Sequence, residues 1–191
     1  MEAAARGQRA IWEADSRPLV EEILAFLLDR LRVQLRAEGA RHDLVAASIG
    51  DDDDILRILA RAAALQSLAE SETGTNLLAA YKRAQNILRI EEKKDGPHDG
   101  PVDEAALVAP EEQALNAALA QAAAATKAAL AAEDFPAAMA ALAALRAPTD
   151  AFFDRILVND PDRSLRLNRL RLLSRLRATM DAVADISKIE A

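Results

Sequence analysis

The sequence has no cysteine, few aromatic residues and few residues that favour β-strands. Without cysteine, disulfides, thiolate metal sites and cysteine nucleophiles are excluded, and a reducing compartment is the expected setting. The 191 residues include 45 alanines and 27 leucines but only 22 β-branched residues. Because alanine and leucine favour helices, this composition predicts an all-α protein and rules out a β-sandwich or a β-barrel.

Long apolar runs and an excess of positive charge are also missing. No run approaches the ~20 apolar residues that cross a bilayer, and the N-terminal residues lack the unbroken apolar stretch of a signal peptide. We therefore expect a cytoplasmic protein without a membrane contact. The net charge of −7 argues against non-specific nucleic-acid binding through a global positive field. Only residues 151–191 are basic, with 8 basic and 6 acidic side chains.

Apolar periodicity, helix caps and helix breakers predict a bundle of about eight helices. The expected helices cover residues 18–37, 43–48, a segment from the Asp51–Asp54 run to residue 70, then 75–92, 111–132, 134–147, a short segment after Pro148, and 162–186. Glycines and prolines predict a loop over residues 93–110, between two helical halves. We assign residues 1–18 to an upstream segment and residues 19–191 to one helical domain.

Motifs of catalytic and metal sites are absent. The sequence has no GxxxxGK[ST], GxGxxG, GxSxG or HExxH pattern, and its two histidines, His42 and His98, lie far apart. The four consecutive aspartates Asp51–Asp54 lack the spacers that let a chain wrap around a cation, so we interpret them as a helix cap. The sequence therefore predicts no catalytic centre and no metal site.

The helix predicted for residues 75–92 carries a polar stripe. Lys82, Asn86, Arg89 and Lys93 fall within about 60° of one another, while apolar residues fall on the opposite side. Cations one helical turn apart, beside an amide, match a phosphate backbone or an unstacked base edge. The alternative is an ordinary solvated face, which periodicity alone favours.

The last predicted helix is rich in arginine. It contains Arg163, Arg166, Arg169, Arg171, Arg175 and Arg177 and no carboxylate from residue 163 to residue 180. Arg169 lies on the apolar face, where an unpaired guanidinium is costly, so we assign it a structural role and expect Asp150 or Asp154 as its partner. Arg163, Arg171 and Arg175 are better placed for a ligand. No aromatic residues alternate with these cations, so a base-stacking platform is not expected.

Several segments resemble one known family in the same order and spacing. They are LAFLLDRLRVQLR (24–36), GARHDL (39–44), LLAAYKRAQNIL (77–88), APTDAFFD (147–154), VND (158–160), LRLNRL (165–170) and ADISKI (184–189). Together they resemble the C-terminal region of the beta subunit of bacterial tetrameric glycyl-tRNA synthetases. The last portion is also similar to the DALR anticodon-binding domain of arginyl-tRNA synthetases.

This resemblance implies a helical bundle that binds the anticodon end of tRNA(Gly). It further implies two protein partners, the rest of the beta subunit and an alpha subunit that carries out glycine adenylation with ATP and magnesium. The domain itself is then expected to be non-catalytic and to bind no cofactor. The RNA-contacting candidates are Lys82, Arg83, Asn86, Arg89 and Lys93, with Arg32, Arg36 and Arg41 as secondary candidates. The alternative is a helical protein-interaction module that does not bind RNA.

Overall fold

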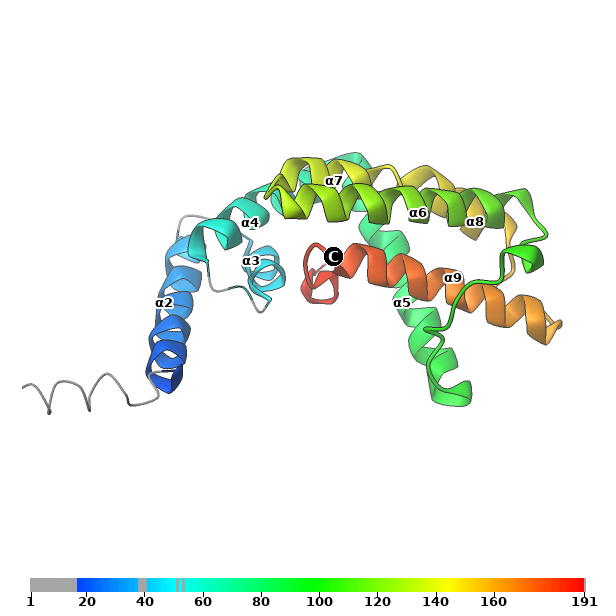
Figure 1. Ribbon diagram of the computed structural model, residues 1–191, viewed down its shortest axis with the longest axis horizontal. Helices are drawn as coiled ribbons and strands as arrows, with labels where there is room; N and C mark the ends of the chain where they lie inside the picture. Colours follow the sequence, from blue (N-terminus) through cyan, green and yellow to red (C-terminus); the bar gives the residue numbers. More distant parts are fainter. Residues whose placement is uncertain (1–16, 38–40, 51, 53, 191) are drawn as a thin grey trace, which may run out of the picture. The chain divides into compact units, whose positions relative to one another are not determined.

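A computed structural model describes residues 17–37, 41–50, 52 and 54–190. The chain forms two compact units, Met1–His42 and Asp43–Ala191. Helix α2 (Arg17–Ala37) belongs to the first unit and agrees closely with the helix predicted for residues 18–37 (Figure 1). The upstream segment that we assign to residues 1–18 lies mostly outside the described residues, and the sequence divides into its two units between His42 and Asp43.

The second unit contains the remaining helices. They are α3 (His42–Ile49), which begins one residue before the unit boundary, α4 (Ile55–Glu70), α5 (Glu72–Asp95), the 3-10 turn η1 (Glu104–Ala106), α6 (Pro110–Ala131), α7 (Phe135–Ala143), α8 (Arg146–Arg155), α9 (Arg163–Asp181) and the 3-10 turn η2 (Ile186–Lys188). No strand occurs in the ranges that the structure describes. The predicted all-α class is therefore confirmed.

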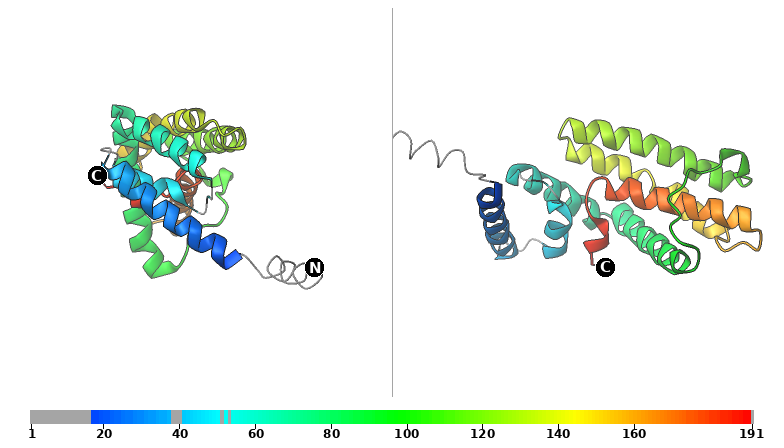
Figure 2. Two further views of the ribbon diagram at one scale, coloured as in Figure 1. Left: turned by 90° about the vertical axis from the view of Figure 1, so that its left-hand side faces the viewer. Right: turned by 60° about the horizontal axis from the view of Figure 1, so that its bottom comes forward.

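The core of the second unit lies where α5, α6, α8 and α9 meet. Helices α6 and α7 pack side by side as a hairpin, and α9 runs next to α6 and also packs on α5 (Figures 1 and 2). Tyr81, Leu88, Leu119, Phe152 and Leu172 are fully buried between these helices. Burial of such large apolar side chains contributes about 1.5–3 kcal/mol each, so this core holds α5 and α9 in fixed positions.

Short polar side chains set most helix starts. Asp54 accepts hydrogen bonds from the backbone N–H groups of Leu56 and Arg57, at 2.8 and 3.2 Å, and Asp162 caps α9 in the same way. The predicted helix cap in the aspartate run is thus confirmed at Asp54, while Asp51 and Asp53 lie outside the described residues. Ser71 caps α5, which therefore begins at Glu72, earlier than predicted.

Other helix ends also differ from the prediction, those of α8 and α9 among them. Helix α8 begins at Arg146 and includes Pro148, because a proline in the first helical turn gives up an N–H that has no intrahelical acceptor. Helix α9 ends at Asp181 instead of Ile186, and the chain continues into η2. Within residues 17–37, 41–50, 52 and 54–190, no helix has the length and apolar character needed to cross a membrane.

Candidate nucleic-acid interface

The polar stripe predicted on α5 is a solvent-facing surface. Lys82 is half-buried, and Asn86, Arg89 and Lys93 are exposed, while the opposite face of the helix carries the buried Tyr81 and its apolar neighbours. Within the part of the chain that the structure describes, Lys82, Arg89 and Lys93 form no ion pair with a carboxylate. We call Lys82, Asn86, Arg89 and Lys93 the α5 stripe.

The acidic residues at the C-terminal end of α5 contact α9 and not the stripe. Glu91 and Asp95 both pair with Arg166 of α9, and Glu92 pairs with Arg177 of α9, with an N–O distance of 2.9 Å. Contacts with α9 therefore neutralise the carboxylates at the C-terminal end of α5. The cations of the α5 stripe keep their charge for a ligand, because an unpaired charge attracts an anion more strongly than a paired one.

Arg83 lies beside the stripe and packs on an aromatic ring. The Cζ atom of Arg83 lies 4.4 Å from the centre of the Phe153 ring, which comes from α8. A guanidinium held over a ring retains its N–H groups for other acceptors. Arg83 is therefore an orientated donor at the edge of the α5 stripe.

The secondary candidates lie elsewhere in the chain. Arg32 and Arg36 belong to α2, and their side chains lie outside the described residues. Arg41 is exposed and belongs to the first unit. These three residues are therefore not part of the α5 stripe as the structure describes it.

Arg169 is buried, and its partners differ from those that we predicted. Its Nε donates to Glu112 of α6 at 2.5 Å, and its Nη1 donates to Asp160 at 2.6 Å and to the carbonyl of Leu157 at 2.9 Å. Hydrogen bonds from the Asp162 N–H and from Arg169 lower the pKa of Asp160. The ion pairs of Arg169 therefore join α9 to α6 and to the turn before α9.

The predicted partners Asp150 and Asp154 point elsewhere. Asp150 lies 3.4 Å from Nε of Arg146, its neighbour one turn away on α8, and Asp154 is exposed. The prediction from nearness in sequence was wrong. The turn between α8 and α9 brings Asp160 close to the Arg169 guanidinium, and the packing of α6 on α9 brings Glu112 close to it.

Glu91 is the centre of a charged cluster between α5 and α9. Its carboxylate, 3% exposed, accepts hydrogen bonds from Lys94 at 2.8 Å, from Asn159 at 3.3 Å and from Arg166. The hydrogen bond from Lys94, followed by that from Arg166, lowers the pKa of Glu91 to about 2. The native protein therefore keeps this carboxylate charged at pH values where an unfolded chain would protonate it.

This pKa shift predicts a pH-dependent loss of stability. The contribution of Glu91 is fully present above its unfolded pKa, about 4.3, and disappears as the pH falls towards 2. In urea denaturation from pH 7 to pH 3, the free energy of unfolding of wild type should fall more steeply with acidification than that of Glu91→Gln. A constant difference between the two proteins over this range would contradict the assignment.

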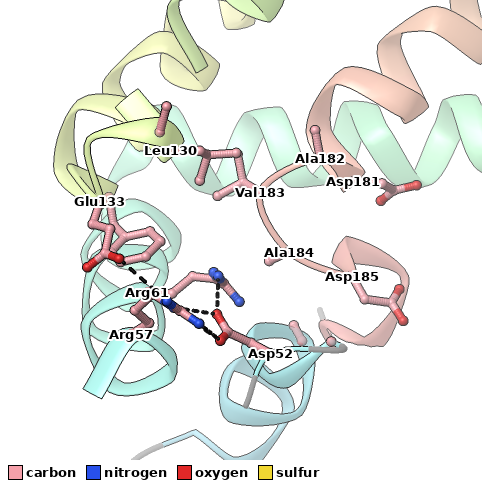
Figure 3. A pocket seen from close by; sticks show the side chains of 14 residues that line it. Asp52, Arg57, Arg61, Leu130, Glu133, Asp181, Ala182, Val183, Ala184 and Asp185 are labelled. Carbon is pink, nitrogen blue, oxygen red and sulfur yellow. Dashed lines mark hydrogen bonds and ion pairs between the residues drawn. The ribbon is translucent and has the colours of Figure 1, made fainter. Parts of the chain in front are cut away.

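A second charged cluster was not predicted from the sequence. Asp52, Arg57, Arg61, Glu133 and Asp185 line a cavity of about 750 Å³ (Figure 3). Asp52 accepts hydrogen bonds from Arg57 at 2.7 Å and from Arg61 at 2.8 Å, which hold the pKa of Asp52 well below its usual range.

Arg61 also donates to the backbone carbonyl of Ser48, at 2.7 Å, so this cluster ties the end of α3 to α4. Arg57 and Arg61 lie one helical turn apart after an aspartate run, and this spacing could have predicted the charged cluster from the sequence. Among the residues that the structure describes, no group of three or more metal-ligating side chains is assembled, in this cavity or elsewhere.

Residues 77–191 match the DALR anticodon binding domain. This match covers more than half of the chain, and the chain belongs to this family. The matched region includes the whole α5 stripe and α9, whereas Arg32, Arg36 and Arg41 lie before it.

Curated relatives extend the similarity towards the N-terminus and confirm the resemblance stated above. The chain is 53% identical over 173 residues to the glycine–tRNA ligase beta subunit of Rhodospirillum centenum, a match that covers 88% of this chain and 24% of that protein. The corresponding subunit of Phenylobacterium zucineum is 51% identical over 88% of this chain and 25% of its own length. That of Cereibacter sphaeroides is 46% identical over 93% of this chain and 26% of its own length. The chain spans about a quarter of the length of these relatives.

Proposed function

We propose that this chain recognises the anticodon of tRNA(Gly), as the C-terminal domain of a glycine–tRNA ligase beta subunit. The observation that carries the proposal is the α5 stripe, a solvent-facing row of three cations and one amide without carboxylate partners among the described residues, on a member of the anticodon-binding family. The names of the relatives supply the amino acid and the subunit.

The proposed mechanism reads unpaired bases while phosphate contacts fix the register. The cytosines at the second and third positions of a glycine anticodon lie in a loop, where bases can be splayed away from their neighbours. Lys82, Arg89 and Lys93 would contact phosphates, and the Asn86 amide, which both donates and accepts, would contact a base edge. Arg83, orientated by Phe153, would contact an adjacent phosphate.

In this proposal the domain contributes to catalysis indirectly. Binding energy gained at the anticodon would hold the acceptor end of the tRNA at a distant active site on the alpha subunit, which uses ATP and magnesium. The domain itself would bind no cofactor and carry out no chemistry. Its place of action would be the cytoplasm, and its protein partners would be the alpha subunit and the rest of the beta subunit.

Filter binding at low salt tests this function with three RNAs: tRNA(Gly), the same tRNA with both anticodon cytosines replaced, and an unrelated tRNA. We expect the replaced anticodon to weaken binding by about tenfold or more, because a hydrogen-bonding contact to one base edge contributes about 1–3 kcal/mol of discrimination and two bases are replaced. Equal binding of tRNA(Gly) and the anticodon variant would refute anticodon recognition.

One observation favours a second candidate function, a helical protein-interaction module. Five large apolar side chains of α2 are exposed: Leu19, Ile23, Phe26, Leu27 and Val33. An exposed apolar helix face is typical of a surface that binds another protein. Absence of binding to every tRNA in the filter assay would favour this second function over the first.

A further inference from the structure

A cavity of about 410 Å³ lies between the loop that follows α5 and the exposed side of α9. Its walls are Asp99, Gly100, Pro101 and Val102 from the loop and Arg171, Ser174, Arg175 and Ala178 from α9. All of these residues belong to the second unit. The buried face of α5 packs on α9, so this cavity and the outward-facing α5 stripe are separate surfaces.

The loop is fastened to α9 beside this cavity. The Asn168 side chain accepts a hydrogen bond from the Asp103 N–H at 2.8 Å and donates one to the Asp103 carbonyl at 2.9 Å. A Cβ atom on Gly100 would lie 3.1 Å from Nε of Arg171, closer than about nine in ten Cβ contacts in proteins. Glycine at this position therefore lets the Arg171 guanidinium lie directly against the loop backbone.

Two polar groups of the cavity, Arg171 and Ser174, are donors without partners among the described residues. Among the described residues, Arg171 forms neither an ion pair nor a side-chain hydrogen bond, although it is half-buried. Ser174 is only 7% exposed, and its hydroxyl also has no hydrogen-bond partner in that part of the chain. The Ser174 oxygen is not among the fully buried polar atoms that lack a partner in the described residues, so it is open to the cavity and can donate to a ligand there.

Arg175 completes the donor set. It donates to the side-chain oxygen of Asn116 on α6, at 2.6 Å, which fixes its guanidinium without neutralising the charge. Three other arginines of α9 differ, since Arg166, Arg169 and Arg177 are all paired with carboxylates. Asp99 lines the cavity as its one carboxylate and opposes an anion there.

We propose that this cavity binds a phosphate group, held by the guanidinium groups of Arg171 and Arg175 and by the hydroxyl of Ser174. A phosphate has the charge for two guanidinium groups and enough acceptor oxygens for all three donors. Its source is either an RNA phosphodiester or a free phosphate compound, and the two arms of the experiment separate these sources.

The first arm titrates the whole chain with inorganic phosphate and follows backbone amide resonances by NMR. We expect saturable shifts in residues 99–102 and 171–178, and an affinity about tenfold weaker in Arg171→Gln because one charge-assisted contact is lost. Asp99→Asn should bind phosphate more tightly than wild type, a gain that misfolding would not produce. Arg155→Gln, on α8, is the matched control and should bind as wild type does. Absence of shifts in these segments, or equal affinity in Arg171→Gln, would overturn the proposal.

The second arm measures tRNA(Gly) binding by Arg171→Gln. Weaker binding with a shallower salt dependence would identify an RNA phosphate as the ligand, and unchanged binding would identify a free phosphate compound, given shifts in the first arm. The anticodon function has its own outcome in the wild-type filter assay. A phosphate-binding chain that ignores tRNA would overturn that function alone, and a tRNA-binding chain without phosphate shifts would overturn the cavity assignment alone.

Discussion

Replacement of Arg169 by methionine should lower the free energy of unfolding by about 3–5 kcal/mol, as expected when one partner of a buried ion pair is removed. The variant leaves the Glu112 carboxylate, 2% exposed, buried next to an apolar side chain, and it leaves the Leu157 carbonyl without its donor. The free energy of unfolding of a typical domain is only about 5–15 kcal/mol, so the variant would lose a large part of its stability. Urea denaturation followed by circular dichroism measures this loss.

A double variant separates the buried charge from the loss of packing. Adding Glu112→Gln to Arg169→Met removes the unpaired carboxylate, while the glutamine side chain can still accept the hydrogen bond that Ala109 N–H now donates at 2.9 Å. We expect the double variant to be more stable than Arg169→Met alone. If the single variant lost less than about 1 kcal/mol, the ion pair would not be a principal contact between α6 and α9.

Arg169 also shows how far sequence reasoning reaches. Helical periodicity placed this residue on the apolar face of the last helix, and its burial agrees with that position. Periodicity describes one helix at a time, however, and Glu112 lies 57 residues away in sequence. Which carboxylates pair with Arg169 depends on how α6, α8 and α9 pack against one another. A local sequence pattern does not predict that packing.

The α5 stripe and the loop after it also combine features that local patterns predict with contacts that they do not predict. The sequence predicted which cations share a face of α5. It did not predict that arginines of α9 would pair with Glu91 and Glu92, so that these carboxylates do not pair with the cations of the stripe. Glycine and proline predicted the loop itself. Its fastening to Asn168, which creates the cavity over α9, required a tertiary contact across 65 residues.

Charge reversal on the α5 stripe should have the largest effect on RNA binding. In Lys82→Glu combined with Arg89→Glu, two cations become anions on a surface without other ion pairs in the described residues, so phosphates would be repelled where they were attracted. We expect tRNA(Gly) affinity to fall by at least about tenfold, and the slope of log affinity against log salt to decrease by about 1–2.

The matched control is Lys127→Glu combined with Arg155→Glu, which changes the net charge equally on exposed positions of α6 and α8. Filter binding over a salt series compares both double variants with wild type. A loss of affinity in the α5 variant alone would assign RNA contact to this face, because a general charge effect would weaken both. Equal losses in both double variants would mean that the stripe contributes only through the overall charge of the protein. An unchanged affinity and salt slope in the α5 variant would mean that the stripe is an ordinary solvated face. Since neither Lys82 nor Arg89 holds two helices together by an ion pair, thermal unfolding of the α5 variant should stay close to that of wild type, which ties any lost affinity to the surface itself.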